Sequence, residues 1–188
     1  LSHATVPFPE HELMAPPELL AALPDAAFDL SPVGASQVVG AGSSPRDHFY
    51  RTVADLLENK VAARVRVIRY EGIDVAGHSY LRYAMPGAFG NVSQDERLRF
   101  GQVLEQQYAL IDADLGRVMA ALGPDDLLLT VSGFGMEPQS LGKRLLATLL
   151  GESELSGTHE RAPEGFLLAW GRGVARGRLP VGSIVDVT

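Results

Sequence analysis

The sequence predicts an α/β fold in which helices pack on a mostly parallel sheet. Three observations lead to this prediction. Segments with helical spacing of apolar residues alternate with strand-like segments along the chain. One strand-like segment is a continuous apolar run, which is typical of a strand inside a parallel sheet. Hydrophobic residues make up 46% of the 188 residues, which is enough for one domain with a sizeable core.

The first 44 residues differ in composition from the rest of the chain. They are rich in proline, alanine and glycine, and the one helix that they predict is short, over about 17–23. We expect residues 1–44 to cap or connect other parts of the protein. Residues 45–188 are expected to form the α/β domain.

The domain begins with a predicted amphipathic helix over about 45–62. Ser44 and Pro45 suit a helix start, and apolar residues follow at spacings of three and four. Asp47 and His48 lie in the first turn of this helix. We expect them to form an exposed pair.

Two more helices are predicted further along the chain. Ser93 and Glu96 have the spacing of a capping box, which starts a long helix that Gly123 and the following proline end. The last helix is expected over about 140–150. With the first helix, they would cover the sheet.

Three segments are predicted to form strands. Residues 65–70 alternate β-branched and polar side chains, and residues 165–170 are mostly apolar. Residues 127–131 are continuously apolar and are bounded by turn residues. We expect this strand to be buried on both faces of the sheet.

Composition excludes several classes of function. The chain has no cysteine, so a metal would need histidine, carboxylate or hydroxyl ligands. The net charge is -7 and no basic face is apparent, which argues against a nucleic-acid partner. No apolar run approaches the ~20 residues that a transmembrane helix needs.

Three residues are candidates for a metal site. Asp74 and His78 are expected in a glycine-containing loop after the strand over 65–70, and His159 in a small-residue loop before the strand over 165–170. Such junctions can converge at one edge of an α/β sheet, where a carboxylate and imidazoles could share a divalent ion. Each residue also has a simpler role, as a turn cap or as an exposed side chain.

An ordered set of segments resembles the type I phosphodiesterases and nucleotide pyrophosphatases of the alkaline phosphatase superfamily. Asp74-Val75-Ala76-Gly77-His78 is similar to the D-x-x-G-H loop of that family. Further similarity lies in the helix at 111–116, the strand at 127–131, the segments 157–159 and 162–166, and the stretch 183–188. The resemblance covers about 45–188 in the family's order.

The resemblance implies an alkaline phosphatase-like fold, a three-layer sandwich with a mostly parallel sheet between helices, of which this chain holds an incomplete part. It implies a phosphate-ester small molecule as substrate. It also implies that Asp74, His78 and His159 are the ligands of one zinc ion. A set of two histidines and one aspartate leaves a coordination position open, as a catalytic ion requires.

The chain departs from the family at the second metal. Where the family has S-D-H-G-M, this sequence has Ser132-Gly133-Phe134-Gly135-Met136. Gly133 and Phe134 offer no side-chain donor, so a second ion cannot be held in the usual way. The family's nucleophile is not recognisable either, so no catalytic residue is assigned.

The resemblance and this departure leave three functional hypotheses open. We expect a phosphoester hydrolase whose segment of 188 residues is inactive by itself. The alternative is a pseudoenzyme or binding module, in which Phe134 fills the space of the lost ion. A single-metal enzyme with altered chemistry is the third hypothesis, because one Lewis acid can still activate water.

The chain's ends lead to two further expectations. The chain begins with Leu1, and Ser183 to Asp186 have the spacing of a helix cap with no helix after it. We therefore expect a segment of a longer protein. A sheet without its neighbouring strands would expose an edge, which favours a homodimer through pairing with a second copy.

Overall fold

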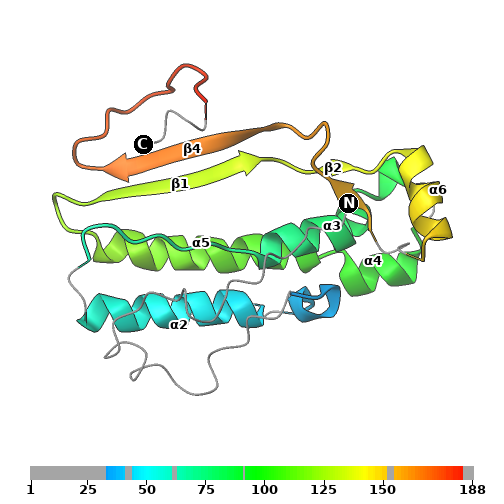
Figure 1. Ribbon diagram of the computed structural model, residues 1–188, viewed down its shortest axis with the longest axis horizontal. Helices are drawn as coiled ribbons and strands as arrows, with labels where there is room; N and C mark the ends of the chain where they lie inside the picture. The colour runs from blue at the N-terminus through cyan, green and yellow to red at the C-terminus, as the bar shows by residue number, and fades with distance from the viewer. Residues whose placement is uncertain (1–32, 41–43, 61–62, 91, 152–154, 184–188) are drawn as a thin grey trace.

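A computed structural model describes residues 33–40, 44–60, 63–90, 92–151 and 155–183. Helices and strands both occur in it, so the mixed α/β class is confirmed. A two-stranded ribbon of β1 (Leu127–Phe134) and β4 (Glu164–Gly171) runs along α5 (Val103–Ala121) in the view of Figure 1. On the other side of α5 in the same view lies α2 (Pro45–Lys60).

The first and last predicted helices are confirmed. The helix α2 starts as expected, because the backbone N–H of Asp47 donates to the Ser44 hydroxyl (3.1 Å) and that of His48 donates to the Ser44 carbonyl (2.8 Å). The helix α6 spans Leu141–Leu149. Both begin and end within two residues of the predicted limits.

The long predicted helix is divided into two. The capping box of Ser93 and Glu96 is confirmed and starts α4 (Gln94–Phe100). The chain then turns at 101–102 before α5 begins. Glycine at the first of these positions disfavours a continuous helix.

The strands pair antiparallel, and not parallel as expected. In the ribbon, Leu129 lies opposite Ala169 and Phe134 lies opposite Glu164. The short strands β2 (Glu137–Pro138) and β3 (Gly157–Thr158) form a second antiparallel ladder. No parallel pair occurs among the residues that the structure describes.

The predicted strand over 65–70 is wrong as an assignment of secondary structure. The segment is extended, but it joins no ladder in the described part of the chain. Val65 and Val67 are 78% and 88% exposed. An alternating sequence predicts an extended backbone, whereas a strand also needs a neighbour to accept and donate its hydrogen bonds.

The burial expected for residues 127–131 is also wrong. Leu127, Leu129 and Val131 are exposed on one face of the ribbon, with Leu129 at 44%. Across the ribbon, Phe166 and Trp170 are about half exposed on the other face. The apolar run does form a strand, but no second layer of described residues packs on it.

The buried core lies instead where three helical elements meet. Its centre is formed by Val38 of η3 (Ala35–Val38), Ala76 of α3 (Gly72–Ala84) and Val103 of α5. The short helix η4 (Pro86–Ala88) follows α3. This core fixes α3, which carries two of the three candidate metal ligands.

Some expectations lie outside the described residues. The helix over 17–23 and the end of the 183–188 stretch belong to this group, as does most of the proposed 1–44 cap. Among the residues that the structure does describe, no helix combines the length and apolar character of a membrane span.

Candidate metal centre

Asp74 and His78 lie on a helix, and the prediction that they occupy a loop is wrong. They fall four residues apart in α3, so both side chains project from one face of it. The helix α3 begins at Gly72, before both residues, because Asp47 of α2 caps its N-terminus. Its carboxylate accepts the backbone N–H groups of Glu71 (2.7 Å) and Gly72 (2.8 Å).

This cap explains two further features of the sequence. Asp47 is 4% exposed, so the expected exposed pair with His48 is wrong for the aspartate. Gly72 is needed because a Cβ there would lie 2.5 Å from an Asp47 carboxylate oxygen. When a side chain of one helix caps another helix, the contact depends on tertiary packing. The spacing of residues along the sequence therefore does not predict it.

The third candidate, His159, reaches α3 from the loop after β3. The backbone N–H of Ser156 donates to the carbonyl of His78 (2.6 Å), and the hydroxyl of Ser156 donates to the same carbonyl (3.1 Å). Gly157 then passes so near that a Cβ would lie 2.4 Å from the Gly77 carbonyl. Glycine at this position lets the loop bring His159 next to Asp74.

The structure therefore brings together all three predicted residues, Asp74, His78 and His159. Their potential ligand atoms lie within 4.8 Å of one another. Nε2 of His159 lies 2.9 Å from one oxygen of Asp74, and Nε2 of His78 lies 3.8 Å from the other. Ligand atoms around a tetrahedral zinc, with bonds of about 2.0–2.1 Å, are roughly 3.3 Å apart, which falls within this spacing.

Backbone carbonyls fix both imidazole rings. Nδ1 of His78 lies 2.9 Å from the carbonyl oxygen of Gly157, and Nδ1 of His159 lies 2.7 Å from that of Gly135. A carbonyl oxygen can only accept, so both Nδ1 atoms donate and both Nε2 atoms are the ones directed at Asp74. Orientation of this kind by a carbonyl is typical of histidines that bind metal ions.

The centre is partly open. The side chains of His78 and His159 are 23% and 21% exposed, and that of Asp74 is 45% exposed. Two imidazole nitrogens and one carboxylate form a ligand set that suits zinc, with a remaining position for water or a substrate oxygen. The donor set thus fits one divalent ion.

The altered positions, Gly133 and Phe134, lie at the end of β1, and Phe134 contacts one of the candidate ligands. A Cβ added to Gly133 would meet no atom within 4 Å. The ring of Phe134 contacts the imidazole of His159, with centroids 4.5 Å apart. Neither side chain can donate electrons to an ion.

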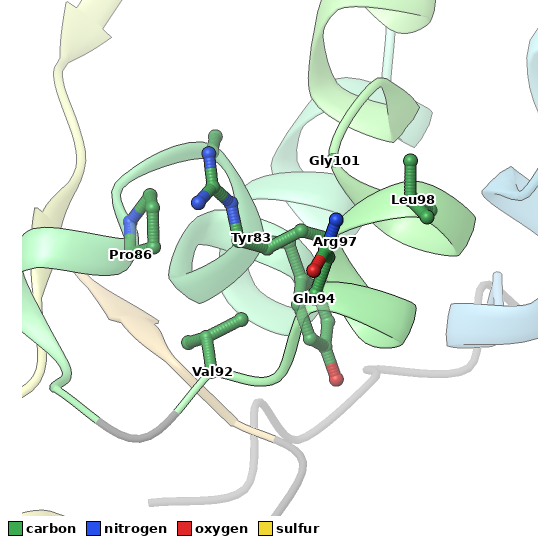
Figure 2. Close-up of a pocket in the computed structure, with 8 residues that line it drawn as sticks. Tyr83, Pro86, Val92, Gln94, Arg97, Leu98 and Gly101 are labelled. Carbon is green, nitrogen blue, oxygen red and sulfur yellow. The ribbon is translucent and has the colours of Figure 1, made fainter.

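A hollow of about 630 Å³ lies elsewhere, between the end of α3 and α4 (Figure 2). Tyr83, Gln94 and Arg97 are among its lining residues, and Figure 2 shows Leu98 at its rim. None of the three candidate ligands lines it. Because Arg97 and Leu98 are exposed, this hollow is an open surface groove, separate from the candidate centre.

Sequence reasoning missed three groups that build the centre: the Asp47 carboxylate, the Ser156 hydroxyl and the Gly135 carbonyl. The pair of glycines Gly77 and Gly157 was the available signal, since glycine marks a close approach of backbones. Comparison of the chain with protein families, with curated proteins and with solved structures finds no match in any of the three.

Proposed function

We propose that this chain is part of a metal-dependent phosphoester hydrolase and that Asp74, His78 and His159 hold one zinc ion. The observation that supports the proposal is the convergence of two carbonyl-oriented imidazoles on one carboxylate. The resemblance to type I phosphodiesterases places the same three residues in one ligand set. The substrate would be a small phosphate ester.

The proposal also extends to the fold. Under it, the helices and the β1–β4 ribbon belong to an incomplete three-layer sandwich of the alkaline phosphatase type, whose central sheet is mostly parallel. The exposed apolar faces of the ribbon support this reading, because such faces are normally covered in a complete α/β layer. The extended segment 65–70 would then be a strand position without its neighbour.

The roles of the residues follow from the geometry. Bound zinc would supply a Lewis acid for a phosphoryl oxygen and would lower the pKa of a coordinated water to about 7. Asp74 contributes the negative charge of the site, and the two carbonyls keep the imidazole Nε2 atoms directed inward. A nucleophile is not assigned within the chain, so we expect the 188 residues alone to show no appreciable turnover.

Metal binding by the chain tests the proposal directly. We expect one zinc ion per chain by isothermal titration calorimetry and by elemental analysis. His159→Ala and Asp74→Asn should each weaken binding by at least about 100-fold, because each removes a ligand. His48→Ala removes an exposed histidine outside the site and should leave the affinity unchanged.

Turnover of p-nitrophenyl phosphate monoester and diester by the full-length protein tests the second half of the proposal. Zinc-dependent hydrolysis that His159→Ala abolishes is the expected result. A full-length protein that neither binds zinc nor hydrolyses either ester would contradict the proposal.

A second candidate function is favoured by Gly133 and Phe134. In this alternative the chain is a pseudoenzyme or regulatory binding module that keeps the fold without the two-metal centre. The double substitution Gly133→Asp and Phe134→His would introduce metal-binding side chains at both positions and distinguish the hydrolase from the binding module. A Cβ at Gly133 meets no atom within 4 Å, so the new carboxylate has room there. A second bound ion accompanied by new activity would indicate simple loss of a site, whereas an unchanged, inactive protein would favour the binding module.

A further inference from the structure

Besides the edge contact of its ring with that of His78 (centroids 4.8 Å apart), three groups hold His159, and two of these three come from consecutive residues. Its Nε2 faces Asp74, its Nδ1 donates to the carbonyl of Gly135 (2.7 Å), and one side of its ring is against Phe134. The two rings are inclined at 53° with centroids 4.5 Å apart. The carbonyl of Gly135 thus accepts a hydrogen bond from the imidazole, and the side chain of Phe134 packs against the imidazole ring.

Phe134 and Gly135 are themselves fixed by the end of the ribbon. The backbone N–H of Gly135 donates to the Pro163 carbonyl (2.8 Å), and the hydroxyl of Ser132 donates to the Phe134 carbonyl (3.0 Å). Phe134 also lies opposite Glu164 in the β1–β4 ladder. The backbone beneath the phenyl ring is therefore anchored independently of His159.

We propose that Phe134 is a positioning residue, which holds the His159 ring in the plane that directs Nε2 at Asp74. The inference rests on the proposed metal site. It adds a residue outside the ligand set that determines the orientation of one ligand. Phe134 acts through the imidazole of His159, which its ring contacts, and not on the ion itself.

A hydrogen bond alone does not define the plane of the imidazole. The torsion between Cβ and an aromatic or imidazole ring has broad minima, so the His159 ring can pivot while Nδ1 stays near its carbonyl acceptor. A phenyl ring against one side of the imidazole restricts this pivot. An inclined aromatic contact at this distance is also favourable in itself.

The exposure of Phe134 distinguishes positioning from folding. Its side chain is 57% exposed, so it contributes little to the buried core of the described residues. Substituting it should leave the fold intact while releasing the His159 ring. Phe166 lies on the same face of the ribbon with 53% exposure and provides a matched control.

The test combines ring proton shifts of His159 in metal-free protein with zinc titration. Phe134→Leu should move the His159 ring resonances, because the ring current of the phenyl group is lost, and should weaken zinc binding about tenfold. Phe134→Tyr keeps the aromatic ring and should keep both the shifts and the affinity, within about twofold of the original protein. Phe166→Leu should change neither.

Each outcome decides the inference. Unchanged His159 resonances in Phe134→Leu would overturn it, as would an equal loss of zinc affinity in Phe134→Leu and Phe166→Leu. If the original protein binds no zinc, the proposed function fails, yet nuclear Overhauser contacts of the His159 ring protons with Asp74 in the metal-free protein still show whether Phe134→Leu turns the imidazole. Displaced resonances with a tenfold weaker affinity in Phe134→Leu alone would support it.

Discussion

Two glycines allow α3 and the β3 loop to approach within contact distance. A Cβ at Gly157 would lie 2.4 Å from the Gly77 carbonyl, and one at Gly77 would lie 2.6 Å from the end of the Met136 side chain. The Met136 side chain is flexible and can move aside, but the Gly77 carbonyl belongs to a helix backbone. Gly157 is therefore the less replaceable of the two.

We predict that Gly157→Ala weakens zinc binding by at least about tenfold, because the added methyl group pushes the loop and His159 away from α3. Gly142→Ala is the control. It adds the same methyl group in α6, where a Cβ meets nothing within 4 Å, and should raise the free energy of unfolding by about 0.5–1 kcal/mol without changing zinc affinity. Titration calorimetry and urea denaturation measure both effects. Equal zinc affinities in the two variants would show that the close approach is not needed.

At the scale of single residues, the sequence identified the three candidate ligands but not their supports. Asp74, His78 and His159 stood out because one carboxylate and two imidazoles were expected in small-residue loops next to predicted strands. Asp47 did not stand out, since an aspartate in a first helical turn is ordinary. Its burial and its bonds to Glu71 and Gly72 arise from the packing of α2 against the start of α3.

At the scale of elements, local sequence signals predicted where helices begin and end better than they predicted which strands pair. The cap at Ser93 and the apolar spacing of α2 depend on neighbours in sequence. The start of α4 and the limits of α2 and α6 were predicted correctly, whereas the end of α4 was not. Residues 65–70 were predicted as a strand, and their extended backbone is present without a ladder. Whether an extended segment becomes a strand is decided by another segment, which its own side chains do not specify.

A cluster of charged and aromatic side chains joins α2, α5 and the extended segment. Asp114 of α5 is 4% exposed and pairs with Arg51 of α2 (2.8 Å) and with Arg117 (2.5 Å). Tyr70 donates a hydrogen bond to the same carboxylate. Burial, followed by the negative charge of Asp114, raises the pKa of Tyr70 to about 12.

The raised pKa of Tyr70 predicts a specific alkaline instability. Its ordinary value is 10.0, so the fold favours the protonated phenol. That stabilisation is complete below about pH 10 and is lost as the pH rises through about 12. Urea denaturation across this range should show a falling free energy of unfolding, and Tyr70→Phe should flatten the fall.

Two variants sharpen the assignment to Tyr70. Asp114→Asn should lower the pKa of Tyr70 only in part, because burial is the larger cause. Tyr108→Phe, at a tyrosine that is 60% exposed, should leave the alkaline dependence as it is. A decline in stability that Tyr70→Phe does not alter would mean that other groups govern the alkaline limit.

At the scale of the whole molecule, the described residues bury little of their apolar material. The buried hydrophobic side chains are few and small, whereas Leu129, Phe166, Leu168 and Trp170 of the ribbon are about half exposed. Composition predicted a sizeable core because composition records how much apolar surface exists. It carries no information on whether a covering layer belongs to the same stretch of chain.

The exposed ribbon predicts self-association of the isolated chain. A two-stranded ribbon is marginal in water, and its outer edges carry backbone groups that can pair with another copy. Face-to-face packing of two ribbons would also cover Leu129 and its neighbours, and each buried leucine contributes about 1.5–3 kcal/mol. We therefore expect a dimer whose fraction rises with concentration in sedimentation velocity or light scattering.

Leu129→Lys should shift this equilibrium toward the monomer by at least about tenfold in the dissociation constant, because it places a charge on the pairing surface and removes a buried leucine from each copy. Leu149→Lys is the matched control, since that leucine is 76% exposed on α6 and lies outside the ribbon. It should leave the dissociation constant unchanged. A monomer at every concentration would refute the expectation, and equal effects of the two lysines would place the contact away from β1. Dimer loss in Leu129→Lys alone would identify the uncovered ribbon as the part of this chain that needs a partner surface.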